Sequence, residues 1–270
     1  MIHFLFSASS ADPRRPDEMF ADQWAALTAA GFTASACSDA AVAGTKPLRD
    51  IPTGSRVVYR GWMLKGREYE AVVRAIEECG ATAFTSPREY LLTHHLPNWY
   101  PLLADLTPET RVYPADADLV ADLRKLAWGA YFIKDYVKSL KTARGSIVRE
   151  PSEVTALIAE MREYRGEIEG GICVRRVEDF VPESETRHFV LYGIGYAATD
   201  GTPIPDVVRQ CAERIPSPFF SVDVAGRTDG VLRVVEIGDG QVSDLVGWSA
   251  AAFATMWARA SAAMKGEPAA

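Results

Sequence analysis

The chain lacks the sequence patterns that mark several common classes of protein. Its four cysteines are far apart and include no CxxC pair, which argues against a zinc ribbon and a disulfide framework. No apolar stretch approaches the roughly 20 residues that cross a membrane. The N-terminal run IHFLF is too short for the apolar region of a signal peptide, and no internal repeat is present. We therefore expect a cytoplasmic protein that does not bind a membrane.

Positive charge is also scarce. The 270 residues carry a formal net charge of −7, with 29 Lys and Arg against 36 Asp and Glu. Nucleic acids bind to basic protein faces, so we expect no nucleic-acid partner. Apolar residues make up 48% of the chain, which is ordinary for a globular protein able to bury a sizeable core. A chain of this length is comfortable for two domains.

The first part of the chain alternates strand and helix signals. The patterns predict strands at 2–8 and 56–61, and helices at 16–31, 67–80 and 87–95. Such alternation is typical of βαβ units around a parallel sheet. The segment 97–117 holds four prolines and is the expected boundary region. We therefore predict an N-terminal α/β domain with a parallel sheet over residues 1–108.

The second part of the chain has a different pattern. It predicts helices at 116–127, 152–166 and 247–262, and strands at 131–137, 171–181, 187–198, 219–225 and 231–238. Ser152 is the expected N-cap of the second of these helices. Strands bunched together with few helices between them favour an antiparallel sheet. We predict an α+β domain over residues 109–270.

Two acidic residues belong to a predicted β-hairpin. The dipeptide Asp229-Gly230 lies between two alternating runs and predicts a two-residue turn. In the register that this turn sets, Asp223 lies opposite Glu236, and the other face of the hairpin is apolar. Two carboxylates this close repel each other unless a cation lies between them, and hard oxygen ligands suit Mg²⁺. The alternative is a solvated hairpin whose outer face is acidic.

A basic stretch follows the first strand of the second part. Lys134 belongs to the predicted strand 131–137, and Lys138, Lys141 and Gly145 follow in a loop. Lysine is a compact point charge suited to phosphate. The loop is not a Walker A motif, because GxxxxGK[ST] occurs nowhere in the chain. The alternative is a solvated basic turn.

The order of these features resembles the ATP-grasp superfamily. The segments FIKDYVKS, ETRHFVL and VEIGDGQVS are most similar to the clade named for one arginine and two lysines, and the similarity spans about residues 110–250. The resemblance implies an ATP-grasp domain preceded by a substrate-side domain. Most members of the superfamily use ATP to phosphorylate a carboxylate, and an amine then attacks the acyl-phosphate.

The resemblance also implies roles for residues that bind the nucleotide. Lys134 would hold the α- and β-phosphates, and Lys138 or Lys141 would close over them. Glu178 would bind the ribose hydroxyls. Backbone groups would meet the edge of the adenine at four positions, namely Val174, Arg175, Arg176 and Val177.

The implied catalytic and metal-binding residues come from the later strands. Arg187 would neutralise the γ-phosphate, while Asp223 and Glu236 would hold Mg²⁺. The family continues its metal motif as Glu-x-Asn, but here Gly238 stands at the Asn position. Asp239 or a water would have to replace the missing ligand.

The substrate end of the site is expected to include residues from the first part. Arg60 and Trp62 follow a predicted strand at the end where open parallel sheets bind ligands. Arg60 is a candidate for gripping a substrate carboxylate, or alternatively for extending over Trp62 toward solvent. His94, His95, Trp99 and Tyr100 are candidates for lining the same cleft. The alternative for all four is packing at the domain junction, which is favoured for Trp99.

The predicted function is therefore an ATP- and Mg²⁺-dependent ligase. It would join a small carboxylate, such as an amino acid, to an amine and release ADP. The sequence leaves two other functions open. One is a kinase-like phosphotransferase that stops at a phosphorylated product, and the other is an ATP-binding module without turnover.

Overall fold

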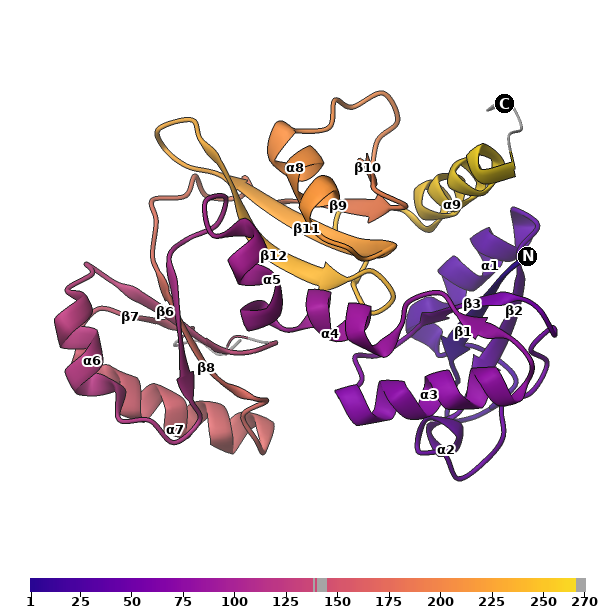
Figure 1. The fold of residues 1–270 in the computed structure, drawn as a ribbon, viewed down its shortest axis with the longest axis horizontal. Helices are drawn as coiled ribbons and strands as arrows, with labels where there is room; N and C mark the ends of the chain where they lie inside the picture. Colours follow the sequence, from indigo (N-terminus) through magenta and orange to yellow (C-terminus); the bar gives the residue numbers. More distant parts are fainter. Residues whose placement is uncertain (138, 140–144, 266–270) are drawn as a thin grey trace. The chain divides into compact units, whose positions relative to one another are not determined.

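The computed structural model describes residues 1–137, 139 and 145–265 (Figure 1). The chain forms two compact units, and each is described by itself. The first unit comprises Met1–Leu91, Thr186–Val222 and Gly238–Ala270, and the second comprises Leu92–Glu185 and Asp223–Ile237. These units do not divide the linear chain at 108, because later segments complete the first unit. The assignment of domains to 1–108 and 109–270 stays a prediction.

The first unit contains the expected parallel sheet. Its strand order is β2-β1-β3-β4, and every neighbouring pair is parallel. The strands are β1 Ile2–Ser7, β2 Thr33–Cys37, β3 Arg56–Arg60 and β4 Thr82–Ala83. The helices of this part are η1 Glu18–Phe20, α1 Ala21–Ala29, α2 Asp39–Val42, α3 Gly66–Glu78 and α4 Pro87–His94. The α/β class predicted for this part is confirmed.

Later segments of the chain also belong to the first unit. They are β9 Thr186–Leu191, β10 Ile194–Tyr196, α8 Asp206–Arg214 and α9 Ala250–Lys265. Of these, β9 and α9 contribute residues to its core. Trp257 of α9 is fully buried, and its ring lies 5.0 Å from Phe4 and 5.0 Å from Phe219, edge to face in both cases. Such aromatic pairs stabilise a core beyond the area that they bury. Both ends of the chain thus contribute to one core.

The second unit is built on an antiparallel sheet. Its strand order is β5-β8-β6-β7, with antiparallel pairing throughout, which confirms the predicted α+β class. The strands are β5 Thr110–Pro114, β6 Tyr131–Asp135, β7 Ile147–Val148 and β8 Gly171–Arg176. The helices are α5 Leu96–Leu103, α6 Leu119–Leu126, η2 Pro151–Glu153 and α7 Val154–Arg165.

The proline-rich segment 97–117 includes most of α5 and all of β5, and its role as a boundary region stays a prediction. Pro97 is tolerated in the first turn of α5, where backbone N–H groups lack helical partners anyway. One local prediction, the N-cap of the helix at 152–166, is wrong. Ser152 is not a helix N-cap, because it lies inside η2. The capping contact belongs to η2, where the carboxylate of Glu153 accepts the backbone N–H of Glu150, the N-cap residue, at 3.1 Å.

The two faces of the second unit's sheet differ in character. Tyr131, Ile133, Ile172 and Val174 pack into one core with residues of α6 and α7. Figure 1 shows these helices along one side of the sheet. Side chains alternate along a strand, so the residues between these face the other side. They are Phe132, Lys134, Cys173 and Arg175.

The hairpin of β11 Phe219–Gly226 and β12 Leu232–Asp239 has a different turn from the predicted one. The N–H of Gly230 donates to the carbonyl of Arg227 at 2.9 Å, and the N–H of Arg227 donates to the carbonyl of Val231 at 2.8 Å. Gly230 has a left-handed φ of 84°. This is a three-residue loop with glycine in its last position, so the predicted register is wrong by one residue at the turn.

One extra residue in β12 changes the register along the hairpin. At the end away from the turn, the N–H of Gly240 donates to the carbonyl of Phe219 at 3.3 Å. From Phe219 to Arg227 the chain advances eight residues, whereas from Val231 to Gly240 it advances nine. A strand that uses one residue more than its partner contains a β-bulge. The direct opposition of Asp223 and Glu236 stays a prediction.

Two general expectations concern the whole chain. All four cysteines are free. Within residues 1–137 and 145–265, no helix combines the length and apolar character needed to cross a membrane.

Candidate functional site

Lys134 and Glu236 meet in the second unit. Lys134 lies in β6 opposite Cys173 of β8, and it is only 4% exposed. Its Nζ lies 2.7 Å from Oε1 of Glu236, whose side chain is 44% exposed. Burying an ammonium group is costly unless a partner compensates for the lost water, and the Glu236 carboxylate is such a partner. The structure therefore brings an expected phosphate ligand and an expected metal ligand into direct contact.

Arg175 lies on the same face of the sheet as Lys134. Its Nη1 donates to the carbonyl of Val235 at 2.6 Å, and its Nη2 donates to Oγ1 of Thr107 at 2.7 Å. Burial lowers the pKa of the Arg175 guanidinium, and the Glu236 carboxylate opposes this shift. The guanidinium remains charged, because arginine does not lose its proton in proteins. The Arg175 guanidinium is therefore a second cation, besides Lys134, that attracts the Glu236 carboxylate.

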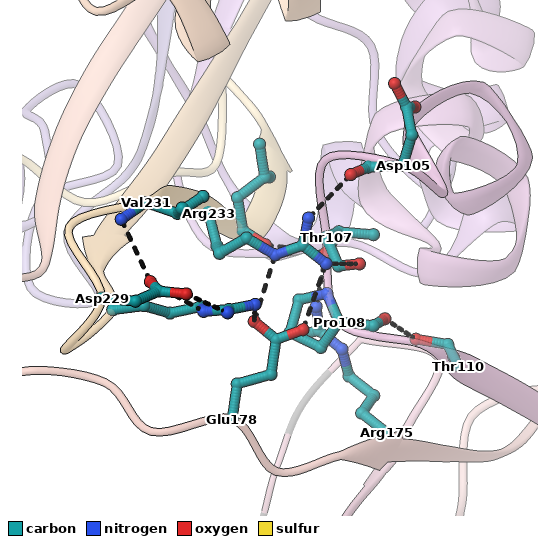
Figure 2. A network of polar contacts seen from close by, with 11 residues as sticks. Asp105, Thr107, Pro108, Thr110, Arg175, Glu178, Asp229, Val231 and Arg233 are labelled. Carbon is teal, nitrogen blue, oxygen red and sulfur yellow. Dashed lines mark hydrogen bonds and ion pairs between the residues drawn. The ribbon is translucent and has the colours of Figure 1, made fainter.

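Glu178, the expected ribose ligand, forms ion pairs with Arg227 and Arg233 (Figure 2). Nε and Nη2 of Arg233 each lie 3.1 Å from the Glu178 carboxylate, and Nη1 of Arg227 lies at 3.5 Å. Arg233 also donates to the carbonyls of Asp105 at 2.7 Å and Thr107 at 2.6 Å. Glu178 therefore helps to join β12 to the segment before β5. Its ribose role stays a prediction.

The chemistry of the two hairpin carboxylates fits a magnesium ion. Asp223 is 3% exposed and lies in β11, and Glu236 lies in β12. Carboxylate oxygens are preferred by Mg²⁺, which is usually held by one or two of them together with waters and phosphate oxygens. Among the described residues, no group of three or more His, Cys, Asp or Glu side chains could hold a metal ion. The binding of Mg²⁺ by Asp223 and Glu236 stays a prediction.

Gly238 and Asp239 belong to the first unit and have their own contacts. A Cβ placed on Gly238 would lie 2.7 Å from Oγ of Ser243 and 2.9 Å from Oγ of Ser221, so an asparagine there requires these hydroxyls to move. Asp239 is fully buried, and its Oδ1 accepts the backbone N–H of Gln241 at 3.0 Å. These contacts give Asp239 a role in the turn, and its role as a metal ligand stays a prediction.

Arg60 is held inside the first unit. It is fully buried, and its guanidinium donates to Gln23 Oε1 at 2.6 Å and to the carbonyls of Gly240 at 3.2 Å and Gln241 at 3.0 Å. The alternative in which Arg60 extends over Trp62 to solvent is therefore wrong. Trp62 is 50% exposed. The binding of a substrate carboxylate by Arg60 stays a prediction.

The other expected residues lie in several places. His94 is 7% exposed at the end of α4, and Trp99 is 1% exposed in α5, so Trp99 serves as packing. Nη1 of Arg187 in β9 donates to the carbonyl of Asp244 at 2.8 Å within the first unit. The roles of His94 and Arg187 stay predictions. Lys138 and Lys141 lie outside the described residues.

The backbone expected to meet adenine is partly used by the sheet. The N–H of Arg176 donates to the carbonyl of Glu109 at 2.8 Å, and the N–H of Val177 donates to the carbonyl of Ala130 at 3.3 Å. Val174 is buried in the core beneath the helices. The adenine contacts stay predictions.

Three side chains that surround Glu236 or Glu178 were missed by sequence reasoning. They are Thr107, Arg233 and the side chain of Arg175. The only signal in the sequence was the presence of arginines within two strands rich in apolar residues. Their contacts join segments far apart in the chain, so the pattern of one segment could not reveal them.

Comparisons with known proteins show the fold and the family of the chain. Three solved structures are similar over most of the chain. D-cycloserine synthetase DcsG matches with a TM-score of 0.63 and 15% identity, over 96% of this chain and 99% of that chain. A RimK domain ATP-grasp protein from Sphaerobacter thermophilus DSM 20745 matches with a TM-score of 0.61 and 15% identity, over 94% of this chain and 98% of that chain. D-alanine–D-alanine ligase from Bacillus anthracis complexed with ATP matches with a TM-score of 0.59 and 14% identity, over 89% of this chain and 86% of that chain. At these identities the likeness shows the fold alone. No curated protein matches the chain.

A family profile for an ATP-grasp domain, family 3 of the clade named for one arginine and two lysines, matches residues 107–259, which is more than half of the chain. This match includes Lys134, Glu236 and the hairpin between β11 and β12. The resemblance inferred from the sequence motifs is confirmed. The chain belongs to family 3 of this clade of ATP-grasp proteins.

Proposed function

We propose that the protein is an ATP- and Mg²⁺-dependent ligase that joins a small carboxylate to an amine and releases ADP. The observation that carries the proposal is the buried Lys134 ammonium 2.7 Å from Glu236, in a chain of the ATP-grasp family. A buried lysine suits phosphate, and the hairpin carboxylates suit Mg²⁺. Two of the similar structures are named as a synthetase and a ligase, which supports the same class of reaction.

The chemistry would proceed in two steps. ATP supplies the γ-phosphoryl group, and Mg²⁺ neutralises charge on its oxygens. A carboxylate oxygen of the substrate attacks the γ-phosphorus, the bond to ADP breaks, and an acyl-phosphate forms. The nitrogen of the amine then attacks the acyl carbon, phosphate leaves, and the amine loses a proton. Because these steps bring anions together, positioning and cations contribute most of the catalysis.

The residues of the chain have the following proposed roles. Lys134 binds the α- and β-phosphates, and Arg187 neutralises the γ-phosphate, with Lys138 or Lys141 closing over them. Asp223 and Glu236 hold Mg²⁺. Glu178 binds the ribose, and Arg60, Trp62 and His94 contribute to the substrate end.

An assay of ADP release tests this proposal. ADP would be measured with Mg-ATP and a panel of carboxylates, including amino acids, each with and without an amine. Amine-dependent ADP release with an amide product is the expected result. ADP release with a stable phosphorylated product would instead identify a kinase-like phosphotransferase. Failure of the protein to bind ATP by calorimetry would overturn the proposal.

A second candidate is an ATP-binding module without turnover. Gly238 and the buried Asp239 favour it, because neither offers an evident third metal ligand. ATP binding by calorimetry, with no ADP formed from any carboxylate and amine pair, would support this candidate. Asp223→Asn and Glu236→Gln should each abolish Mg²⁺-dependent turnover in a ligase, with the fold unchanged by circular dichroism.

A further inference from the structure

The side chain of Arg175 connects β8 to two other segments of the second unit. Arg175 is 7% exposed, and it donates to the carbonyl of Val235 at 2.6 Å and to Thr107 Oγ1 at 2.7 Å. Its Nε is buried without a hydrogen-bond partner among the described residues. Figure 2 shows Arg175 beside the segment that contains Thr107 and Pro108. A buried arginine held in this way fixes the position of what it binds.

The segment before β5 holds the neighbouring residue of β12. Thr107 Oγ1 donates to the carbonyl of Val234 at 2.7 Å, and the N–H of Val234 donates to the carbonyl of Leu106 at 2.9 Å. β12 is the edge strand in the order β10-β9-β11-β12, so one side of its backbone is available for such contacts. The outer edge of β12 is thus hydrogen-bonded to this segment at Val234, two residues before Glu236.

Two successive carbonyls of β12 are bound by groups outside its sheet. In a regular strand, successive carbonyls point to opposite sides, and one of them would face the paired strand. Here Thr107 binds the carbonyl of Val234, and Arg175 binds that of Val235. This departure agrees with the extra residue that β12 contains between Val231 and Gly240. We place the bulge at Val234 and Val235.

A bulge changes the direction of the side chains that follow it. Glu236 is the next residue, and its carboxylate points to Lys134 at 2.7 Å. We propose that Arg175 is a positioning residue, which holds the bulge at Val235 so that the Glu236 carboxylate reaches Lys134 and, when nucleotide is bound, Mg²⁺. The part of this proposal that concerns Mg²⁺ rests on the proposed function, whereas the part that concerns Lys134 does not.

A structural comparison tests the part that does not depend on the reaction. Ligand-free crystal structures would be determined for Arg175→Met, which keeps an apolar stem of similar length but removes the donors, and for Arg111→Met. Arg111 is a matched control, because it lies on the neighbouring strand β5 and its half-exposed side chain pairs with Glu109. In Arg175→Met, we expect the Glu236 carboxylate to separate from Lys134 beyond ion-pair distance, about 4 Å. An unchanged contact and an unchanged path at Val235 would overturn the proposal.

A Mg²⁺ titration tests the part that depends on the reaction. Mg²⁺ affinity would be measured by calorimetry in the presence of a non-hydrolysable ATP analogue, and by Mg²⁺-dependent ADP release. Removing a positioning partner of a metal ligand typically weakens metal binding roughly 10- to 100-fold, which is the effect expected for Arg175→Met. Loss of a nearby positive charge would alone strengthen Mg²⁺ binding, so the sign identifies a positioning role. Equal or stronger binding would contradict it.

A second substitution covers the case in which Arg175→Met does not fold. Arg175→Lys retains the positive charge but cannot bridge two acceptors with a planar fork. We expect it to show the same loss of Mg²⁺ affinity to a smaller extent, with circular dichroism and thermal unfolding close to those of Arg111→Met. Wild-type affinity in Arg175→Lys and a wild-type Glu236 position would overturn the proposal. If the wild-type protein binds no Mg²⁺ with the analogue, the proposed function fails, while the crystallographic comparison still decides the role of Arg175 toward Lys134.

Discussion

Lys134 and Glu236 are separated by 102 residues in the chain, and their charged groups lie 2.7 Å apart. Without nucleotide, each group serves as the other's counter-ion. The proposed function requires both groups to change partners, because Lys134 would bind phosphate and Glu236 would bind Mg²⁺. Mg-ATP supplies both new partners together, since it carries a cation for Glu236 and anionic oxygens for Lys134.

Glu236→Gln should have opposite effects on the binding of ATP and on turnover. The change removes the anionic partner of Lys134, so ATP in EDTA should bind about two- to five-fold more tightly than to the wild type, as the loss of a partly exposed ion pair predicts. Mg²⁺-dependent ADP release should fall to background. Calorimetry with ATP in EDTA measures the first effect. Asp223→Asn is the control, because it removes a hairpin carboxylate but leaves the pair of Lys134 and Glu236. Equal gains in the two variants would show a general charge effect instead.

Gly238→Asn should destabilise the protein, although it restores the residue type of the family motif. The new Cβ would lie 2.7 Å from Ser243 Oγ and 2.9 Å from Ser221 Oγ, so these hydroxyls must move. Overpacking of this kind costs about 1–3 kcal/mol in the free energy of unfolding. Chemical denaturation measures the loss.

The addition of Ser243→Ala tests the cause of that loss. This change removes the nearer hydroxyl, so the double variant should be less destabilised than the sum of the two single variants. Simple additivity of the two effects would mean that the asparagine clashes elsewhere.

Glu178→Gln should lower stability whether or not nucleotide is present. Its carboxylate accepts two hydrogen bonds from Arg233 at 3.1 Å, and both side chains are largely buried. Weakening these charged hydrogen bonds should cost roughly 1–3 kcal/mol. Glu109→Gln is the control, because Glu109 pairs with Arg111 at the surface and its loss should cost less than about 1 kcal/mol.

The same variant tests the ribose role of Glu178. Binding of ATP and of 2′-deoxy-ATP would be compared by calorimetry in wild type and in Glu178→Gln. If Glu178 binds the ribose, the wild-type preference for ATP should shrink in the variant. The same ratio of affinities in both proteins would remove Glu178 from the nucleotide site while leaving its structural role.

His3 should make the protein less stable as the pH falls. It is 1% exposed, and its ring nitrogens lie 2.9 Å from Thr33 Oγ1 and 2.8 Å from Ser35 Oγ. Burial lowers the pKa of His3 to about 4, against 6.5 in the unfolded chain, although Asp50 acts in the opposite direction. Between these values the unfolded chain binds a proton that the folded chain does not. Stability from this group is complete above pH 6.5 and is lost as the pH falls toward 4, by up to about 3 kcal/mol.

Urea denaturation at neutral pH and near pH 4.5 measures this effect. In His3→Gln the loss of stability between the two pH values should be smaller than in the wild type, because position 3 no longer titrates. An identical loss in both proteins would mean that His3 can be protonated without cost, and that other groups cause the acid sensitivity.

Strong local patterns were sufficient to predict several elements. The apolar runs at 2–8 and 56–61 form β1 and β3, and the amphipathic segment 67–80 overlaps all of α3 except its first residue. Weak patterns were not sufficient. β2 has the sequence TASAC, whose small residues carry little strand signal, and its pairing with β1 decides its structure. Pro97 and Pro101 hid α5, because prolines usually mark the end of a helix.

The turn of the hairpin illustrates a limit of short sequence signals. Asp229-Gly230 is compatible with a two-residue loop and with a three-residue loop, since both accept glycine with positive φ. In the structure, Asp229 accepts the N–H of Val231 at 3.2 Å and pairs with Arg227, which favours the longer loop. The register error at the turn and the extra residue in β12 have opposite effects, and neither was visible in the alternation of residues.

The sequence by itself determined the elements with strong local patterns, the family and the identities of Lys134, Asp223 and Glu236 as candidate site residues. These follow from local periodicity and from motifs in a fixed order, which are properties of the linear chain. Tertiary structure alone decided that Lys134 meets Glu236 and that Arg175 holds the backbone beside it. It also decided that a side chain at Gly238 would meet the hydroxyls of Ser221 and Ser243. Such contacts join residues far apart in sequence, and the packing of a whole unit determines which of them meet.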